Sequence, residues 1–164
     1  MSSTLRTVQG GVRPEVLAAV SIDVLIRRVG PDDLAVVLSA SPLFDSPADR
    51  AATARFLAAA DHHLLMAFEG ERAVGFVSGV ETTHPDKGTE MFLYELAGDE
   101  SSRRRGSGAS LVEALRRLAI DRGCYGMWVL TDDDNDAALA TYRRAGASTP
   151  EAVVMLDWTF RPDD

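Results

Sequence analysis

The stretch that decides the fold is "RRRGSGASLVEALRRLAIDRG", residues 103–123. Leu111, Leu115 and Leu118 recur at helical spacing, and charged residues occupy the positions between them. This pattern predicts an amphipathic helix over 106–122 with one apolar stripe facing a core. Gly123 stands where a glycine commonly ends a helix.

Three arginines, Arg103, Arg104 and Arg105, stand immediately before Gly106 and Gly108 at the start of this helix. The first backbone N–H groups of a helix have no partner within it, and glycines let another molecule approach the backbone closely. Together with the helix dipole and the arginines, these groups favour an anion, and a diphosphate is the natural occupant. A solvated basic turn is the plainer alternative.

The two best-known phosphate motifs are missing from this stretch. The pattern GxxxxGK[ST] is absent, and GxGxxG fails because Leu111 stands at the third glycine position. The anion site therefore belongs to another class of fold.

Hydrophobic periodicity places further elements on both sides of this helix. The expected strands are 20–29, two within 63–81 joined by a turn at 69–71, 90–99, 125–131 and 152–160; the expected helices are 30–40, 46–60, 106–122 and 135–147. Ser46 is the expected N-cap of the second helix, with Pro47 in its first turn.

The order β-α-α-β-β-β-α-β-α-β predicts the fold class as mixed α/β, in one domain over residues 20–164. A central, mostly antiparallel sheet flanked by helices should lead into a parallel β-α-β unit. On the strand 90–99, Phe92, Tyr94 and Leu96 should face one side, with Leu93 and Glu95 on the other. Residues 1–19 are expected to be disordered or loosely docked.

Composition narrows the possible classes of function. The chain has 164 residues and a net charge of −8, which argues against non-specific binding to nucleic acid or to anionic membranes. We expect no transmembrane segment, no secretory signal and a cytoplasmic location. Cys124 is the only cysteine, which excludes an internal disulfide. The adjacent His62 and His63 would face opposite sides of a strand, so we expect surface histidines and no metal site.

The motif Arg103-x-x-Gly106-x-Gly108, between a strand and an amphipathic helix, resembles the acetyl-CoA signature [R/Q]-x-x-G-x-[G/A] of the GNAT superfamily of N-acetyltransferases. The order of elements from about residue 20 to 160 is similar to that superfamily. More narrowly, "FLYELA" (92–97), "TDDDNDAALATYRRAGA" (131–147) and "VVMLDW" (153–158) resemble the aminoglycoside 3-N-acetyltransferases of the gentamicin and fortimicin type. Two departures are Glu95, where aspartate is expected, and "ATYRRAGA" in place of "ALYxxLG".

The resemblance implies an acetyl-CoA-dependent enzyme whose acceptor amine attacks the thioester directly. The implied acetyl-CoA contacts are Leu96, Ala97, Gly98, Arg103, Arg104, Arg105, Gly106, Ser107, Gly108, Ala109, Asn135, Ala138 and Tyr142. Glu95 would accept a proton from the amine or only hold a cationic substrate, and Tyr142 would protonate the leaving thiolate. A solvated Glu95 and a core Tyr142 are the alternatives.

The implied acceptor is a cationic small molecule, an aminoglycoside acetylated at its 3-amino group, and a homodimer is expected. Its implied contacts are Tyr94, Glu95, Asp132, Asp133, Asp134 and Asp136. The aspartates also suit the cap of the helix that follows them. Another acceptor (a polyamine, an amino acid or a peptide N-terminus), a non-catalytic acyl-CoA sensor, and an adaptor without a ligand are the other possibilities.

Overall fold

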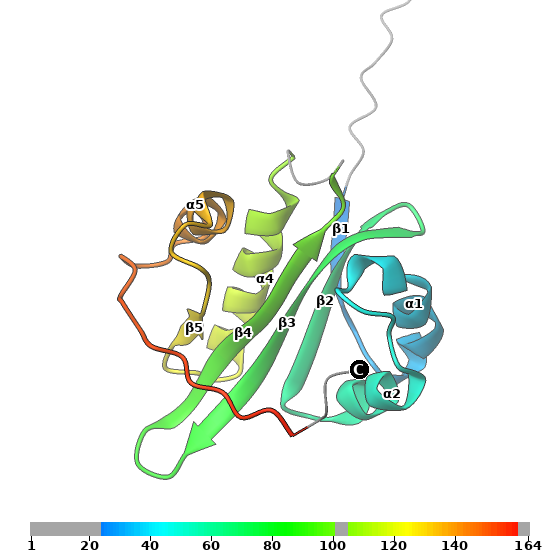
Figure 1. Ribbon diagram of the computed structural model, residues 1–164. Helices are drawn as coiled ribbons and strands as arrows, with labels where there is room; N and C mark the ends of the chain where they lie inside the picture. The colour runs from blue at the N-terminus through cyan, green and yellow to red at the C-terminus, as the bar shows by residue number, and fades with distance from the viewer. Residues whose placement is uncertain (1–23, 101–104, 161–164) are drawn as a thin grey trace, which may run out of the picture.

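The computed structural model describes residues 24–100 and 105–160. Its strands form one sheet in the order β1-β2-β3-β4-β5 (Figure 1). They are β1 (Val24–Val29), β2 (His62–Glu69), β3 (Arg72–His84), β4 (Gly88–Gly98) and β5 (Met127–Val129). Neighbouring strands are antiparallel from β1 to β4, whereas β4 and β5 are parallel. The predicted mixed α/β domain with one parallel unit is confirmed.

Helices cover both faces of the sheet. They are α1 (Leu34–Ser39), α2 (Arg50–Ala58), α4 (Ser107–Asp121) and α5 (Asp136–Arg144). The helices α1 and α2 lie on one face, α4 crosses the other, and α5 lies beside α4 (Figure 1). Among the helices of the described residues, none combines the length and apolar character needed to cross a membrane.

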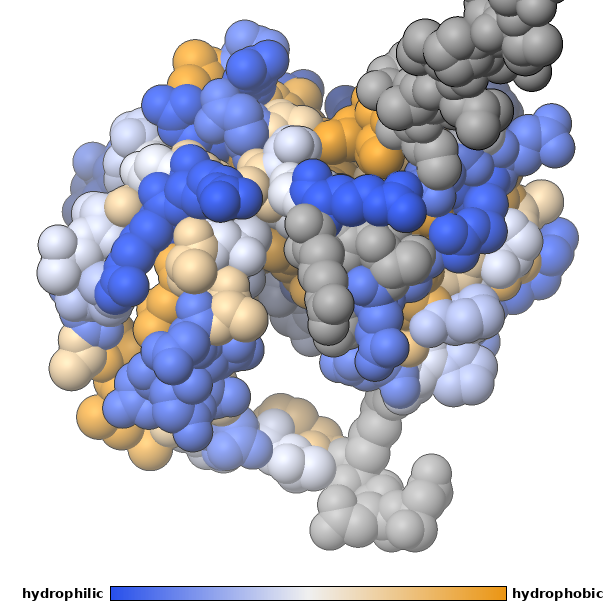
Figure 2. All heavy atoms as spheres, turned by 90° about the horizontal axis from the view of Figure 1, so that it is seen from above, coloured by the Kyte–Doolittle hydropathy of each residue, from blue (hydrophilic) through white to orange (hydrophobic). Residues whose placement is uncertain are grey.

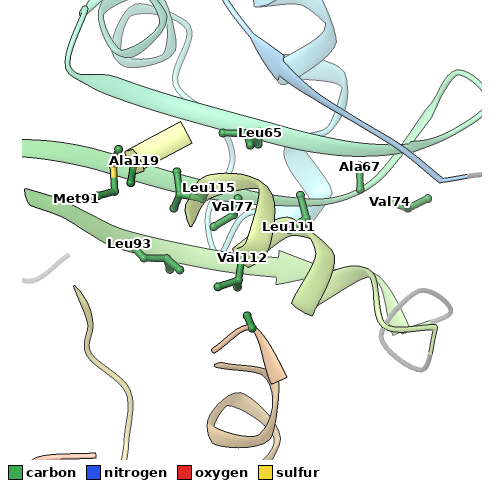
Figure 3. Packing of buried hydrophobic residues seen from close by; sticks show 11 residues of the cluster. Leu65, Ala67, Val74, Val77, Met91, Leu93, Leu111, Val112, Leu115 and Ala119 are labelled. Carbon is green, nitrogen blue, oxygen red and sulfur yellow. The ribbon is translucent and has the colours of Figure 1, made fainter. Parts of the chain in front are cut away.

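The helix α4 holds the larger of two hydrophobic clusters. Leu111, Val112 and Leu115 are almost fully buried. They belong to one cluster with Val77 and Leu93 of the sheet (Figure 3). Gly106 and Gly123 flank α4 with positive φ angles of 80° and 77°. The predicted helix and both of its ends are therefore confirmed.

The helix α2 begins later than predicted. The Asp49 carboxylate accepts a hydrogen bond of 2.7 Å from the backbone N–H of Ala52, so Asp49 is the N-cap and the predicted cap Ser46 is wrong. Pro47 accordingly lies before the helix. Ser46 and Asp49 both have side chains that can cap a helix. The hydrogen bond from the Ala52 N–H to Asp49 makes Asp49 the residue at which α2 begins.

The predicted strand 152–160 is wrong: residues 151–160 form neither helix nor strand, and all are exposed. The predicted strand 125–131 shortens to Met127–Val129, and Trp128 is 40% exposed. Both differences have one cause. No strand among the described residues lies on the outer side of β5, so β5 is a short edge strand.

A β-bulge changes the predicted faces of β4. Gly79 pairs with Leu93 and Ser78 with Glu95, which leaves Tyr94 as an extra residue. Leu96 then packs with Leu93 in the cluster under α4, whereas Ala97 packs in the cluster under α1 and α2. Because side chains alternate along a strand, Glu95 shares the face of Ala97, and the predicted pairing of Leu93 with Glu95 on one face is wrong.

His63 is fully buried, contrary to the expectation of a surface residue. Its Nε2 lies 2.7 Å from the Glu81 carboxylate, which also accepts a hydrogen bond from Arg122. Burial lowers the pKa of His63, and Glu81 opposes that shift. This small polar group joins β2, β3 and the end of α4.

We expect Leu115→Ala to lower the free energy of unfolding by about 2–5 kcal/mol, because a buried leucine truncated to alanine leaves a cavity. The matched control is Leu25→Ala, since Leu25 is 62% exposed on β1. The control should change stability by less than about 0.5 kcal/mol. Urea denaturation of both variants measures this, and equal losses would contradict the account of the core.

Candidate active site

A cleft opens where β4 and β5 separate. The two strands pair only over Met91–Leu93 and Met127–Val129, while β4 continues to Gly98. The separated end of β4, the start of α4, the inner side of α5 and the loop after α1 enclose a cleft of about 1050 Å³. This separation leaves one edge of β4 beside open space rather than beside a strand.

The first turn of α4 forms one wall of the cleft. Gly106, Ser107, Gly108 and Ala109 all line it. A Cβ atom added to Gly108 would lie 3.4 Å from the Cγ2 atom of Thr141, which is ordinary contact and would fill the space between α4 and α5. The structure thus brings together the predicted backbone cradle at a helix N-terminus.

The arginines around this cradle differ from the prediction. Arg105 donates to Glu69 at 3.0 Å and does not line the cleft, and Arg103 and Arg104 lie outside the described residues. Arg144 lines the cleft instead, with its Nη1 atom 3.8 Å from the position of a Cβ on Gly106. The prediction missed Arg144, whose only local signal is the pair of arginines ending the helix that begins at Asn135.

Arg72 is a second arginine that the prediction missed. It lines the cleft from the start of β3. Its guanidinium donates to Asp99 at 2.7 Å and lies 3.5 Å from Glu69. Arg72 is therefore held in place by two carboxylates, while Arg144 has no ion-pair partner among the described residues.

The end of β4 forms a second wall. Leu96, Ala97 and Gly98 line the cleft, as predicted for residues that contact an extended ligand. Beyond Leu93, β4 pairs with β3 on one edge and has no strand on the other within the described residues. An extended chain lying along that edge would continue the sheet as an added strand.

Glu95 and Asp45 bring negative charge to the cleft. Both line it, Glu95 from the bulged part of β4 and Asp45 from the loop between α1 and α2. Partial burial raises the pKa of Glu95, and the nearby Asp45 charge raises it further. The prediction missed Asp45, because only the fold brings the segment before α2 next to β4.

Tyr142 faces the cleft from α5. Its ring is half-buried, and burial raises the pKa of the phenol, which keeps it protonated. The hydroxyl has no hydrogen-bond partner among the described residues. Asn135 and Ala138 line the same wall, and the Asn135 side chain accepts a 3.1 Å hydrogen bond from the Ala138 N–H as the N-cap of α5.

The structure does not bring the remaining predicted residues into the cleft. Tyr94 is 70% exposed and makes an edge-to-face contact with Phe92. The predicted acidic cluster, Asp132, Asp133, Asp134 and Asp136, is exposed and does not line the cleft. Thr131 lines it instead, so this loop meets the cleft through its first residue only.

The cleft therefore combines four kinds of group: a helix N-terminus with a nearby arginine, an open strand edge, two carboxylates and a protonated phenol. This set can hold an anionic group and an extended chain, and it can accept and donate protons. Across the part of the chain that the structure describes, no three His, Cys, Asp or Glu side chains form a group that could hold a metal ion.

Comparisons with known proteins agree with this geometry. The family model described as "Acetyltransferase (GNAT) family" matches residues 35–147. No curated protein matches the chain.

Several solved structures share the fold. An aminoglycoside acetyltransferase, meta-AAC0020, from an uncultured soil metagenomic sample, solved in complex with sisomicin, is 22% identical with a TM-score of 0.77, over 84% of this chain and 97% of that one. A second from such a sample, HMB0005, is 24% identical with a TM-score of 0.75, over 85% and 99% of the two chains. Aminoglycoside N-acetyltransferase AAC(6')-Iy in complex with CoA is 21% identical with a TM-score of 0.71, over 83% and 95%.

Removing the Asp45 charge should lower the pKa of Glu95, because a neighbouring carboxylate disfavours the ionised form. NMR titration of the Glu95 side-chain carboxyl should place its midpoint above that of an exposed glutamate in the wild type. The midpoint should move to lower pH in Asp45→Asn. The control Asp32→Asn removes an exposed charge and should leave the midpoint where it was. An unchanged midpoint in Asp45→Asn would show that the Asp45 charge does not act on the pKa of Glu95.

Proposed function

The chain belongs to the GNAT family of acetyltransferases, which use acetyl-CoA, and we propose that the acceptor of this acyltransferase is an amine of an aminoglycoside. The observation that carries the proposal is the pair of carboxylates, Glu95 and Asp45, in the same cleft as the helix N-terminus. Carboxylates attract the ammonium groups of such a substrate. Similar structures include enzymes described as aminoglycoside acetyltransferases, one of them with sisomicin bound.

The cleft fits coenzyme A by its chemistry. Gly106 and Gly108 leave room for a phosphate group against the first turn of α4, and Arg144 supplies a positive charge near Gly106. The open edge of β4 at Leu96 and Ala97 suits an extended arm with amide groups. When bound, acetyl-CoA supplies the acetyl thioester that the amine attacks.

The proton transfers fall to Glu95 and Tyr142. An amine attacks only when it is neutral, so a proton must leave the ammonium group first. Glu95 accepts that proton, and its raised pKa brings it closer to the pKa of the group it deprotonates. Tyr142 is protonated and has no competing hydrogen bond among residues 24–100 and 105–160, so it can donate a proton to the departing thiolate. Asp45 holds the cationic substrate and tunes Glu95.

The 3-amino position remains a prediction, since a structure named AAC(6')-Iy also shares the fold. We further propose a homodimer that acts in the cytoplasm, where acetyl-CoA is made and used. Acetylation of an aminoglycoside would remove a positive charge from the drug and so confer antibiotic resistance.

The phosphate cradle is tested with Gly108→Val. The branched side chain would fill the space beside Thr141 and block the backbone of α4. Calorimetry should show acetyl-CoA affinity about 2- to 30-fold weaker, since the interaction of an anion with a helix N-terminus contributes about 0.3–2 kcal/mol. Gly30→Val is the control, because a Cβ at Gly30 would meet nothing within 4 Å. Unchanged affinity of Gly108→Val for acetyl-CoA would show that the phosphate groups do not bind at the first turn of α4.

The acceptor is tested by release of coenzyme A with gentamicin, sisomicin, fortimicin, kanamycin, apramycin, spermidine and short peptides. Turnover with aminoglycosides should exceed turnover with the other amines, and NMR of the product locates the acetyl group. Turnover with spermidine or peptides alone would contradict the proposal that the acceptor is an aminoglycoside. Binding of acetyl-CoA without turnover of any amine would favour a sensor.

The catalytic roles are tested with the acceptor that gives the highest turnover. Glu95→Gln and Tyr142→Phe should each lower kcat/KM by about 100-fold or more, the usual contribution of a general acid or base. Asp133→Asn is the control, because Asp133 lies outside the cleft. If neither variant loses activity, both roles are wrong.

A further inference from the structure

Four charged side chains form a network of ion pairs at one end of the sheet: Glu69, Arg72, Asp99 and Arg105. Glu69 accepts a hydrogen bond of 3.0 Å from Arg105 and lies 3.5 Å from the guanidinium of Arg72. Arg72 donates to Asp99 at 2.7 Å, so negative and positive charges alternate along the network. Figure 2 looks onto this end of the molecule, and hydrophilic side chains cover much of it. The proton transfers proposed above use none of the four residues.

The two carboxylates are the more buried members of this network. The side chain of Glu69 is 13% exposed and that of Asp99 is 23% exposed, whereas both arginines are exposed. A carboxylate that has lost most of its contact with water needs charged or polar partners. A single ion pair at the surface contributes little, but Glu69 interacts with two arginines at once. Glu69 is therefore the central member of the network.

The network joins segments on either side of the connection from β4 to α4. The backbone N–H of Asp99 donates to the Val74 carbonyl at 3.0 Å, which keeps the end of β4 beside β3. Arg105 stands at the other side of the connection, immediately before Gly106, whose φ of 80° turns the chain into α4. Both Asp99 and Arg105 are thus linked to the residues that flank the turn between β2 and β3 (Figure 1).

We propose that Glu69 is a positioning residue for acetyl-CoA: through Arg105, it holds the first turn of α4 where that turn binds the phosphate groups. Glu69 does not line the cleft, so it acts without contact with the ligand. Loss of its charge would release Arg105 and leave Arg72 with Asp99 alone. The inference rests on the phosphate site proposed at Gly106 and Gly108.

The same ion pair also permits the opposite effect on binding. Arg105 belongs to the stretch that resembles the acetyl-CoA signature, and a guanidinium bound to Glu69 is not available to a phosphate group. If Glu69 withheld Arg105 from the ligand, removal of the Glu69 charge would strengthen binding. The geometry favours positioning, because Arg105 does not line the cleft, whereas Arg144 does.

Glu69→Gln tests the proposal, because it removes the charge and keeps the size of the side chain. Calorimetry should show a dissociation constant for acetyl-CoA about 2- to 10-fold higher, within the 2- to 30-fold loss expected when the helix N-terminus is blocked. With the amine that gives the highest turnover, KM for acetyl-CoA should rise and kcat should stay unchanged, because a loss of uniform binding alters KM alone. An unchanged or lower dissociation constant, or a fall in kcat instead of a rise in KM, would overturn the proposal.

The matched control is Glu113→Gln on the same helix. Glu113 pairs with Arg116 and Arg117 and does not line the cleft. Its removal should leave the dissociation constant for acetyl-CoA unchanged. An equal loss in Glu113→Gln and Glu69→Gln would mean that charge on the protein, rather than the network, sets the affinity, and would overturn the proposal.

A double-mutant cycle tests whether Glu69 acts through Arg105. The double variant Glu69→Gln/Arg105→Gln should bind acetyl-CoA no more weakly than Glu69→Gln alone, because both changes break the same contact. Losses that multiply would show that the two residues act independently, and would overturn the proposal. Arg105 is exposed, so Arg105→Gln should fold, and its own weaker binding carries the test if Glu69→Gln does not fold.

Gly108→Val, measured beside these variants, separates the positioning role from the phosphate site on which it rests. Weaker binding in Gly108→Val without any loss in Glu69→Gln would overturn the role of Glu69 and leave the phosphate site in place. Unchanged binding in both variants would overturn the two proposals together. Weaker binding in both, with the control unchanged, is the expected result.

Discussion

The parting of β4 from β5 is the constraint on which the rest of this structure depends. Three paired residues on each strand hold the two together, and β4 then continues without β5 to Gly98. Polar backbone groups on a strand need partners, so the free edge of β4 is a place for a ligand. The start of α4, which packs on the sheet, and the inner side of α5 line the space that β5 leaves open. The short pairing of β4 with β5 therefore explains both the opening of the cleft and the backbone groups that β4 offers to a ligand.

Elements with a strong local signal were predictable. The helix over 106–122 has an apolar stripe and glycines at both ends, and the structure places α4 there. The start of α2 was not, because Ser46 and Asp49 both suit an N-cap, and the structure shows that Asp49 makes the capping hydrogen bond. Residues 152–160 show a further limit. Their alternation describes a strand, but a strand also requires a neighbour, and no described residue of this chain pairs with the outer edge of β5.

The residues of the candidate site also fall into those that a local sequence pattern marks and those that only the fold brings to the cleft. The glycines before the helix mark Gly106 and Gly108 in the sequence, and the resemblance to the GNAT superfamily adds Leu96 and Ala97. All four line one cleft. Asp45 and Arg144 come from segments far from these; no local pattern marks Asp45, and Arg144 is marked only by the pair of arginines that ends α5. The four aspartates form a strong local signal, but they are exposed and their loop meets the cleft only at Thr131, so their contact with a substrate stays a prediction.

The bulge at Tyr94 has a consequence for comparing related chains. One extra residue moves Glu95 from the face under α4 to the face under α1 and α2. An alignment that preserves strict alternation through β4 would match Glu95 to a core position in a relative without the bulge. A gap of one residue at Tyr94 corrects the match. The position of the bulge is therefore a safer guide than the alignment column to the residue of a relative that corresponds to Glu95.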